Sequence, residues 1–397
     1  MSAKVKLGID RIGEPEVRKL LEGKRLGVLS AASGLASDYR FPIDILNEKF
    51  NVAGIFAPEH GPRGVLGPGE KVRGGRDRIT GLPVWSLYED VIARREATEN
   101  SRYMPADDSL SAVDCVVYDM QDVGSRYFTY VSSLFYLMKV CGARGIPVVV
   151  LDRPNPLGSR VEGNVLDPDY SSFIGLTEVP IRHGMTVGEL ARFYNGDYGL
   201  GCDLTVVEMT GWDGSMYWDD TGLPFVRPSP NLPTLESIWV YNGICLFEGT
   251  NVSLGRGTAV PFTVVGAEYI NPVEYAAVLN ADESMKGVRF SPAFFEAYYS
   301  KLTGVALYGV TVHVTDKREL EPVRLGVTML RTLEAMYPDD FEYSAPKNPA
   351  NRWHIDLAAG GTELRLSGLP AEELCRKWQA EADRFAAEKA KYYLYRH

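Results

Sequence analysis

Four nearly continuous apolar runs in the first half of the chain constrain its fold more than any other feature. They lie within residues 26–30, 52–60, 113–122 and 146–153, and several of them stop abruptly at polar residues. Strands that are apolar on both faces are typical of parallel sheets with helices packed on each side. Helical patterns separate the runs, at residues 16–22, 43–49 and 128–143. This alternation predicts an α/β fold with a doubly wound parallel sheet.

The length of the chain predicts a second domain. Its 397 residues exceed the ~250–300 residues at which a single hydrophobic core stops growing. Residues 227–233 include three prolines, which is typical of a rigid connection between domains. We therefore predict one domain over residues 1–227 and a smaller second domain over residues 228–397. In the second domain we expect a strand at 307–315, an amphipathic helix at 323–336 and a long charged helix at 371–392.

The charge of the chain limits its partners. Acidic side chains number 52 and basic ones 42, so the formal net charge is −10, and the sequence contains no run of basic residues. Phosphate backbones require clustered lysine and arginine, so we expect no nucleic-acid partner. No apolar stretch reaches the ~20 residues that cross a bilayer, so we expect no membrane partner either. Nothing in the sequence commits the chain to an oligomeric state.

Two features bear on the cell compartment. Residues 1–10 contain no apolar signal core, so we expect a cytoplasmic protein, or an extracytoplasmic one if a leader has been trimmed. The cysteines are odd in number and form no Cys-x-x-Cys pair, so we expect buried, reduced thiols. They are Cys115, Cys141, Cys202, Cys245 and Cys375.

Several common catalytic motifs are absent from the sequence. Neither Gly-x-Gly-x-x-Gly nor Gly-x-x-x-x-Gly-Lys-[Ser/Thr] occurs, so we expect the glycine-rich stretch 61–75 to be a surface loop and not a site for NAD or ATP. The Gly-x-Ser-x-Gly motif of a serine nucleophile is also missing. The five histidines are scattered singly and no His-Glu-x-x-His motif occurs, so we predict no metal site.

Three carboxylates lie where apolar runs end. Glu59 follows Pro58 at the end of one run, Asp122 closes another, and Glu248 stands in an apolar run that turns through Gly249. Ligands of doubly wound sheets bind beyond the carboxyl ends of the strands. Partial burial there raises the pKa of a carboxyl group toward the range of a general acid, while a second one in a wetter setting stays ionised. Cleavage of a glycosidic bond requires such a pair, so Glu59, Glu248 and Asp122 are the candidate catalytic residues.

Histidine, arginine and asparagine side chains beside these runs are the candidate ligand-binding groups. A histidine in a loop at the end of a strand or before a helix suits hydrogen bonding to a ligand. An arginine guanidinium matches a carboxylate with two parallel hydrogen bonds, so one arginine is expected to bind an anionic group of the substrate. The candidate substrate-binding residues are His60, Arg153, Asn155, Arg182, His183, Asn231, Asn251 and Arg256.

Seven short strings occur in one order along the chain. They are Ala57-Pro-Glu-His-Gly61, Gln121-Asp-Val-Gly124, Leu151-Asp-Arg-Pro-Asn-Pro156, Val161-Glu-Gly163, Arg182-His-Gly-Met-Thr186, Pro228-Ser-Pro-Asn231, and Phe247-Glu-Gly-Thr-Asn251 with Gly255-Arg-Gly-Thr258. Together they resemble the NamZ-type exo-β-N-acetylmuramidases, a glycoside hydrolase family long described as a domain of unknown function. The resemblance extends over essentially the whole chain.

The resemblance implies removal of terminal N-acetylmuramic acid from the non-reducing end of peptidoglycan fragments, so muramyl saccharides are the expected partners. It implies a Rossmann-like amino-terminal domain, a smaller carboxy-terminal α/β domain and a cleft between them, with no organic cofactor. Glu59 matches the family's Pro-Glu-His-Gly string and is expected to be the general acid, with Glu248 or Asp122 as its partner. Arg182 or Arg256 is expected to bind the lactyl carboxylate.

Two alternatives stay open at the level of the sequence. Carboxyl groups ~5–5.5 Å apart would give retention and ~6.5–9.5 Å inversion, while participation of the substrate's own acetamido group is a third mechanism. The alternative to an enzyme is a non-catalytic muropeptide- or sugar-binding protein. In that case the arginine and asparagine side chains bind the ligand and the acids are structural.

Overall fold

A computed structural model describes residues 5–67, 69–87 and 103–397. Its largest sheet has seven strands in the order β3-β4-β2-β1-β5-β6-β9. Neighbouring strands run parallel except β3, which pairs with β4 in the antiparallel direction. The strands are β1 (Leu26–Ser30), β2 (Val52–Ala57), β3 (Gly75–Arg76), β4 (Pro83–Ser86), β5 (Cys115–Asp119), β6 (Val148–Leu151) and β9 (Leu204–Val207).

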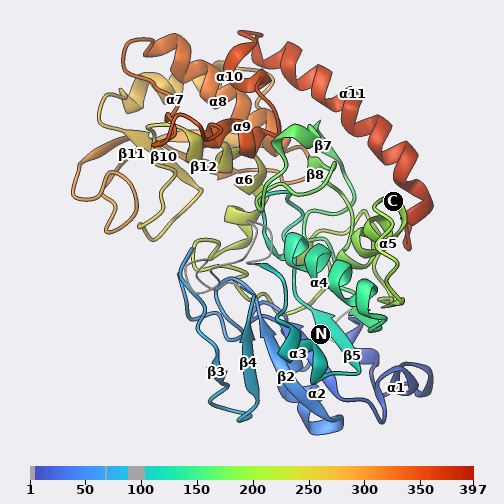
Figure 1. The fold of residues 1–397 in the computed structure, drawn as a ribbon. Helices are drawn as coiled ribbons and strands as arrows, with labels where there is room; N and C mark the ends of the chain where they lie inside the picture. Colours follow the sequence, from blue (N-terminus) through green and yellow to red (C-terminus); the bar gives the residue numbers. More distant parts are fainter. Residues whose placement is uncertain (1–4, 68, 88–102) are drawn as a thin grey trace.

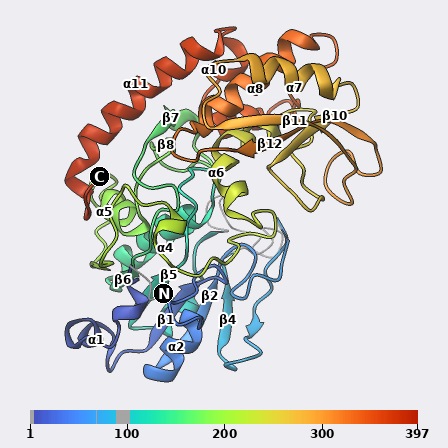
Figure 2. The same ribbon diagram turned by 180° about the vertical axis from the view of Figure 1, so that it is seen from behind.

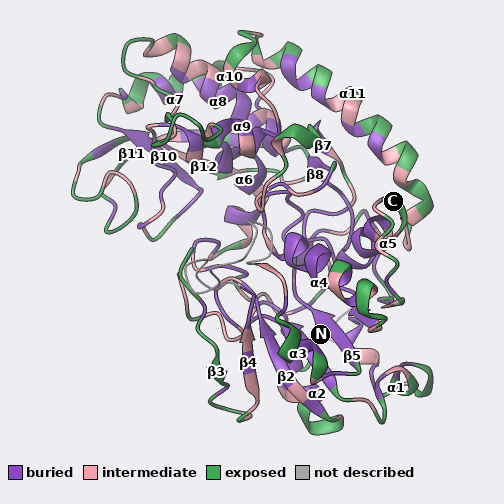
Figure 3. Ribbon diagram, in the orientation of Figure 1, coloured by how far each residue is buried: buried purple, intermediate pink, exposed green. Residues whose placement is uncertain are grey.

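Helices cover both faces of this sheet (Figure 1). On β5, which Figure 3 shows buried along its whole length, Val116 and Tyr118 pack into the cluster that contains α4 and α5. Cys115 and Val117 pack into the other cluster, with α1 and α2. The expected doubly wound α/β fold is confirmed. The helices of this half are α1 (Pro15–Leu21), α2 (Pro42–Lys49), α3 (Asp107–Ser111), α4 (Tyr130–Arg144) and α5 (Val187–Asp197).

An ion pair fills the position where sheets of this kind usually bind ligands. The six parallel strands follow the Rossmann order, so the winding reverses between β1 and β5. There the Arg153 guanidinium pairs with Asp119 and donates to the backbone carbonyls of Gly34 and Leu35. The Arg153 and Asp119 side chains are 1% and 0% exposed. The usual crevice of the Rossmann-like half is therefore closed.

The carboxy-terminal half is built around a three-stranded antiparallel sheet in the order β10-β12-β11. Buried and exposed side chains mostly alternate along β11 and β12, because one face of this sheet packs and the other meets solvent. The expected strand and amphipathic helix are present as β12 and α8. The elements are α6 (Leu235–Ile244), β10 (Val264–Ala267), α7 (Pro272–Ala281), β11 (Val288–Phe295), β12 (Leu307–Val314), α8 (Pro322–Met336), α9 (His354–Ala359) and α10 (Glu363–Leu366).

Two glycines fix the position of α6. A Cβ atom on Gly243 would overlap the Pro322 carbonyl oxygen of α8, and one on Gly326 would overlap the Gly243 carbonyl oxygen. Because neither glycine has a side chain, the backbones of α6 and α8 can pack in direct contact. α6 leads into the 3₁₀ turn Cys245–Gly249, which carries Glu248. The apolar run before Glu248 is therefore helical and not a strand.

The helix α11 (Ala371–Lys389) returns from the carboxy-terminal half to the amino-terminal half, as Figures 1 and 2 show. It packs against the antiparallel strands β7 (Glu162–Val165) and β8 (Pro180–Arg182). We call residues 371–397 the carboxy-terminal strap. One hydrophobic cluster also contains residues from both halves. The two halves are thus joined by the proline-rich connection, by the strap and by a shared core.

The end of the strap binds to buried acids of the amino-terminal half. The Tyr395 hydroxyl donates to Asp152 at 2.7 Å, and the Leu394 N–H donates to Glu189 at 2.8 Å. The His397 Nε2 lies 2.9 Å from the same Glu189 carboxylate. These contacts hold the end of the chain against the amino terminus of α5, which Glu189 helps to cap.

Three further expectations concern the whole chain. The five cysteines are buried and free, as expected. Within residues 5–67, 69–87 and 103–397, no helix is long and apolar enough to cross a bilayer. The domain boundary expected between residues 227 and 228 stays a prediction.

Candidate active site

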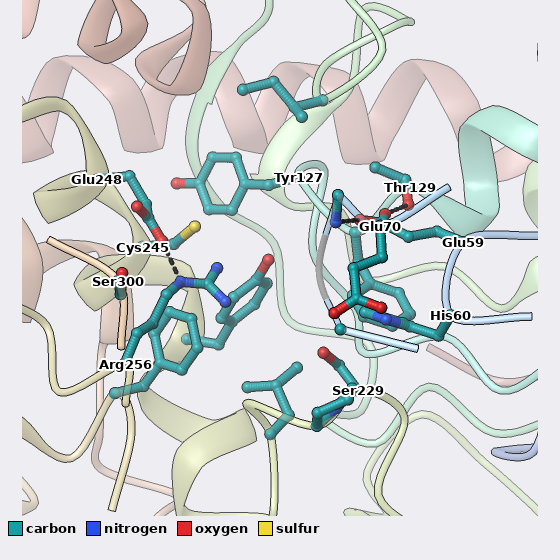
Figure 4. Close-up of a pocket in the computed structure, with 18 of the residues that line it drawn as sticks. Glu59, His60, Glu70, Tyr127, Thr129, Ser229, Cys245, Glu248, Arg256 and Ser300 are labelled. Carbon is teal, nitrogen blue, oxygen red and sulfur yellow. Dashed lines mark hydrogen bonds and ion pairs between the residues drawn. The ribbon is translucent and has the colours of Figure 1, made fainter. Parts of the chain in front are cut away.

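A pocket of about 740 Å³ lies between the two halves of the molecule (Figure 4). Its volume falls within the ~300–1,000 Å³ typical of small-ligand sites. Four residues expected from the sequence line it: Glu59 and His60 on the amino-terminal wall, and Glu248 and Arg256 on the carboxy-terminal wall. Figure 4 shows the two walls facing each other across the pocket. An acid and a histidine on one wall therefore face an arginine and a second acid on the other.

Glu59 lies in the loop after β2, and two hydrogen bonds orient its carboxyl group. Its Oε1 accepts from the Gly69 N–H at 2.9 Å, and its Oε2 accepts from the Thr129 hydroxyl at 2.7 Å. Thr129 directly precedes α4, so the carboxyl group lies beside the amino-terminal end of that helix. A carboxyl group held in one orientation at a pocket wall suits a general acid or base.

His60 has a fixed ring orientation and a left-handed backbone. Its Nδ1 lies 3.0 Å from the Leu66 carbonyl oxygen, which only accepts. The proton of the neutral ring is therefore on Nδ1, and Nε2 is an acceptor. The φ angle of His60 is 68°, and Phe262 and Ser300, which also line the pocket, have φ angles of 66° and 82°. Backbone strain of this kind concentrates at functional sites.

Glu248 and Arg256 form an ion pair on the carboxy-terminal wall. Glu248 accepts from the Arg256 Nε–H, while Nη1 and Nη2 make no hydrogen bond to any described residue and are directed into the pocket (Figure 4). The guanidinium carbon lies 4.9 Å from the centre of the Phe262 ring. Burial lowers the pKa of Arg256, but Glu248, Cys245 and Tyr241 together outweigh burial, so the pKa is raised overall. Arg256 thus stays a cation with its outer edge available to an anion.

Two more basic residues surround Glu248. The Lys301 ammonium donates to the carbonyls of Phe247 and Thr250, at 2.9 and 2.8 Å, and so fixes the turn that carries Glu248. Burial lowers the pKa of Lys301 to about 8, against the opposing effect of Glu248. Burial also lowers the pKa of His354, which lines the pocket. The carboxy-terminal wall therefore holds one carboxylate among several basic groups and suits a negatively charged ligand group.

Asp122 and His183 contact each other outside the pocket. The His183 Nδ1 accepts from the Met185 N–H, so its Nε2 carries the proton and donates to Asp122 at 3.2 Å. The Gly124 N–H donates to the same Asp122 oxygen at 2.7 Å. Gly124 has φ 74°, and a Cβ atom there would overlap the Asn155 side chain. Asp122 and His183, both buried, brace the loop after β5.

The other five predicted residues also lie outside the pocket. They are Arg153, Asn155, Arg182, Asn231 and Asn251. All but Asn231 hydrogen-bond through their side chains to the backbone of neighbouring loops. Asn231 supports the pocket indirectly, because its Oδ1 accepts from the hydroxyl of Tyr299, a lining residue, at 2.8 Å. Ligand binding by these five residues stays a prediction.

Sequence reasoning missed several residues of the pocket. The most important is Glu70, whose carboxyl group projects into the pocket from the amino-terminal wall, beside His60 (Figure 4). It lies in the glycine-rich loop that follows Glu59 directly, and that proximity was the available signal. Among the residues that the structure describes, no three metal-ligating side chains gather in one place. Further lining residues not expected as site residues are Tyr127, Thr129, Tyr130, Tyr241, Tyr299 and His354.

Family models match both halves of the chain. The model described as "Exo-beta-N-acetylmuramidase NamZ, N-terminal" matches residues 26–236, and its C-terminal counterpart matches residues 239–395. A relative from Bacillus subtilis (strain 168), the peptidoglycan beta-N-acetylmuramidase NamZ, is 39% identical to this chain. The alignment covers 99% of this chain and 92% of the relative. The similarity therefore includes both walls of the pocket.

Two crystal structures of DUF1343 family proteins from Bacteroides fragilis have the same fold. The first has a TM-score of 0.87 and 32% identity, and the match covers 99% of this chain and 100% of that one. The second has a TM-score of 0.74 and 30% identity, with 99% of each chain covered. The arrangement of the two halves is thus shared with experimentally determined structures.

Proposed function

Since the chain belongs to the NamZ exo-β-N-acetylmuramidase family, we propose that the pocket between its halves binds the terminal N-acetylmuramic acid of a peptidoglycan fragment. The protein is a glycoside hydrolase, a peptidoglycan β-N-acetylmuramidase. The alternative of a non-catalytic muropeptide-binding protein is therefore set aside. A cytoplasmic location and the absence of nucleic-acid and membrane partners stay predictions.

Glu59 is the general acid of this proposal. The observation that carries it is the orientation of the Glu59 carboxyl group at the pocket wall by Gly69 and Thr129. Unlike Glu248, Glu59 forms no ion pair with a described residue. Its proton passes to the glycosidic oxygen as the bond to the anomeric carbon breaks, so the leaving sugar departs as a neutral alcohol.

Arg256 binds the lactyl carboxylate of the substrate. Its two Nη groups offer parallel donors to the pocket, which is the geometry that a carboxylate prefers. Glu248 then positions Arg256 and does not act on the glycosidic bond. Asp122 and Arg182, buried outside the pocket, are not assigned a direct role in this proposal.

Glu59→Gln tests the acid. The substitution preserves size but replaces one acceptor oxygen with an NH2 group that cannot act as the acid, so kcat for a muramyl disaccharide is expected to fall ~10²–10⁴-fold. The loss is expected to be smaller for an aryl N-acetylmuramide whose leaving group needs no proton. Both rates are measured beside the matching aryl N-acetylglucosaminide, which the wild type is expected to cleave poorly.

Glu283→Gln is the matched control, because Glu283 is exposed and lies outside the pocket. It is expected to keep wild-type activity on both muramides. A wild type that cleaves neither muramide, or a Glu59→Gln variant as active as the wild type on the disaccharide, would contradict the proposal.

A further inference from the structure

Three carboxyl groups line the pocket in the described part of the chain, and they are distributed unevenly between its walls. Glu59 and Glu70 are on the amino-terminal wall, whereas Glu248 is on the carboxy-terminal wall (Figure 4). Glu248 is engaged by Arg256 and lies close to Lys301 and His354. The carboxyl group that shares a wall with Glu59 is therefore that of Glu70.

The backbone couples Glu70 to Glu59. The N–H of Gly69, the residue before Glu70, donates to Glu59 Oε1 at 2.9 Å. The Glu70 N–H in turn donates to the Gly67 carbonyl oxygen, which closes a tight turn at this point. The Glu70 side chain is exposed and makes no hydrogen bond or ion pair with any described residue. Glu70 thus offers the pocket a carboxylate with unused acceptor capacity, held beside the proposed acid.

This placement favours one of the three mechanisms over the others. Direct inversion and retention through an enzyme nucleophile both need carboxyl groups that flank the scissile bond from different sides. Glu59 and Glu70 approach from one wall, and the carboxylate opposite them is committed to an arginine. The remaining nucleophile is the acetamido group of the substrate itself, which needs a neighbouring carboxylate to orient its N–H.

We propose that Glu70 is a second catalytic residue, which accepts a hydrogen bond from the substrate acetamido N–H so that the acetamido oxygen attacks the anomeric carbon. This inference rests on the proposed function. In the first step Glu59 gives its proton to the glycosidic oxygen, the bond from that oxygen to the anomeric carbon breaks, and the acetamido oxygen bonds to that carbon. The Glu70 carboxylate faces the positive charge that develops on the acetamido group.

In the second step water replaces the acetamido oxygen. The water oxygen bonds to the anomeric carbon, its proton passes to the Glu59 carboxylate, and the bond to the acetamido oxygen breaks. The acetamide and the protonated Glu59 are both restored, so no other reactant is consumed. Two displacements at one carbon give overall retention, so N-acetylmuramic acid is released as its β-anomer.

The stereochemical outcome and the Glu70 variants test this inference together. Proton NMR of the wild-type reaction is expected to show the β-anomer of N-acetylmuramic acid before mutarotation. Glu70→Gln is expected to lower kcat about 100-fold, with KM changed less than threefold, and Glu70→Asp is expected to be intermediate. Glu283→Gln is the control, and the thermal midpoint of each variant shows whether it is folded.

Substrates with altered N-acyl groups report on the nucleophile. Successive fluorination of the acetamido methyl group weakens its oxygen as a nucleophile, so the wild-type kcat is expected to fall with each fluorine. A thiazoline analogue of the cyclised sugar is expected to inhibit the wild type more tightly than Glu70→Gln.

The failures of the two proposals are distinguishable. A wild type that hydrolyses no muramide contradicts the proposed function and this inference with it. Four results would contradict this inference alone. They are release of the α-anomer, a trapped covalent sugar on the enzyme, a kcat that does not change with fluorination, and a folded Glu70→Gln variant with wild-type kcat. In each of those four cases Glu59 keeps its role as the acid.

Discussion

Arg256 is the residue on which recognition of the muramic acid carboxylate depends. Arg256→Gln removes the charge and one of the two parallel donors but keeps a polar side chain. A hydrogen bond to a charged group contributes roughly 1.5–3 kcal/mol, so we expect kcat/KM for the muramide to fall about 10–100-fold, mostly through KM. Inhibition by free N-acetylmuramic acid should weaken by a similar factor.

N-acetylglucosamine is the control ligand for Arg256→Gln, because it lacks the lactyl carboxylate. Its inhibition constant is expected to change little. An equal weakening of both sugars would show that Arg256 supports the shape of the pocket and does not bind the carboxylate.

Residues of the site differ in how well the sequence predicts their positions. Glu59 and His60 come just after the buried strand β2, so the path of the backbone places them at the edge of the sheet. Arg153 also follows a strand, but its side chain points inward to Asp119. No local sequence pattern predicts that direction. Glu70 was missed because its loop has no hydrophobic period that would fix the direction of a side chain.

At the scale of elements, Arg63 anchors the loop between β2 and β4 that carries Gly69 and Glu70. Its guanidinium donates to Asp77, at the far end of the loop, and to Asp44 on α2. This pairing with Arg63 holds the pKa of Asp77 well below its usual range. The ends of the loop are thereby tied to a helix of the sheet domain.

Asp77→Asn tests this anchor through its pH dependence. A carboxyl group whose pKa is lower in the folded than in the unfolded state stabilises the fold above its unfolded pKa of about 4, and less as the pH falls below it. We expect the variant to lose roughly 1–3 kcal/mol of unfolding free energy at pH 7 and less at pH 3. Urea unfolding at both pH values measures this. An equal loss at both would show that the charge of Asp77 is irrelevant.

The two sheets differ in how well sequence patterns predict them. The strands of the doubly wound sheet are continuous apolar runs, because both of their faces are buried. In the carboxy-terminal sheet only β12 was expected. β11 is an edge strand that contains Pro292 and has five of its eight side chains outside the core, and β10 has only four residues. Short or interrupted runs of this kind do not differ clearly from loops.

At the scale of the whole molecule, Tyr395 joins the strap to the amino-terminal half. Its hydroxyl donates to Asp152, whose pKa burial raises to about 7. A raised carboxyl pKa means that the fold binds a proton more tightly than the unfolded chain. The stability that Asp152 contributes is therefore full below about pH 4 and is lost as the pH rises toward 7.

Tyr395→Phe removes a donor that favours the ionised form of Asp152. The loss of unfolding free energy is expected to be about 1–2 kcal/mol at pH 8 and smaller at pH 5, where Asp152 carries a proton. Chemical unfolding at the two pH values checks the difference. A loss that is greater at pH 5 would contradict the assigned partner.

The strap also determines how chimeras of this family can be assembled. Exchanging the carboxy-terminal wall between relatives would let Arg256 and its surroundings be compared on one catalytic background. A single junction where the two family models meet, between residues 236 and 239, would place the relative's strap against Asp152 and Glu189 of this chain. A second junction before residue 371 would keep the end of the strap on its own partners Asp152 and Glu189, while α11 would then pack on an α8 from the relative. Such a chimera would change one wall of the pocket and leave the other intact.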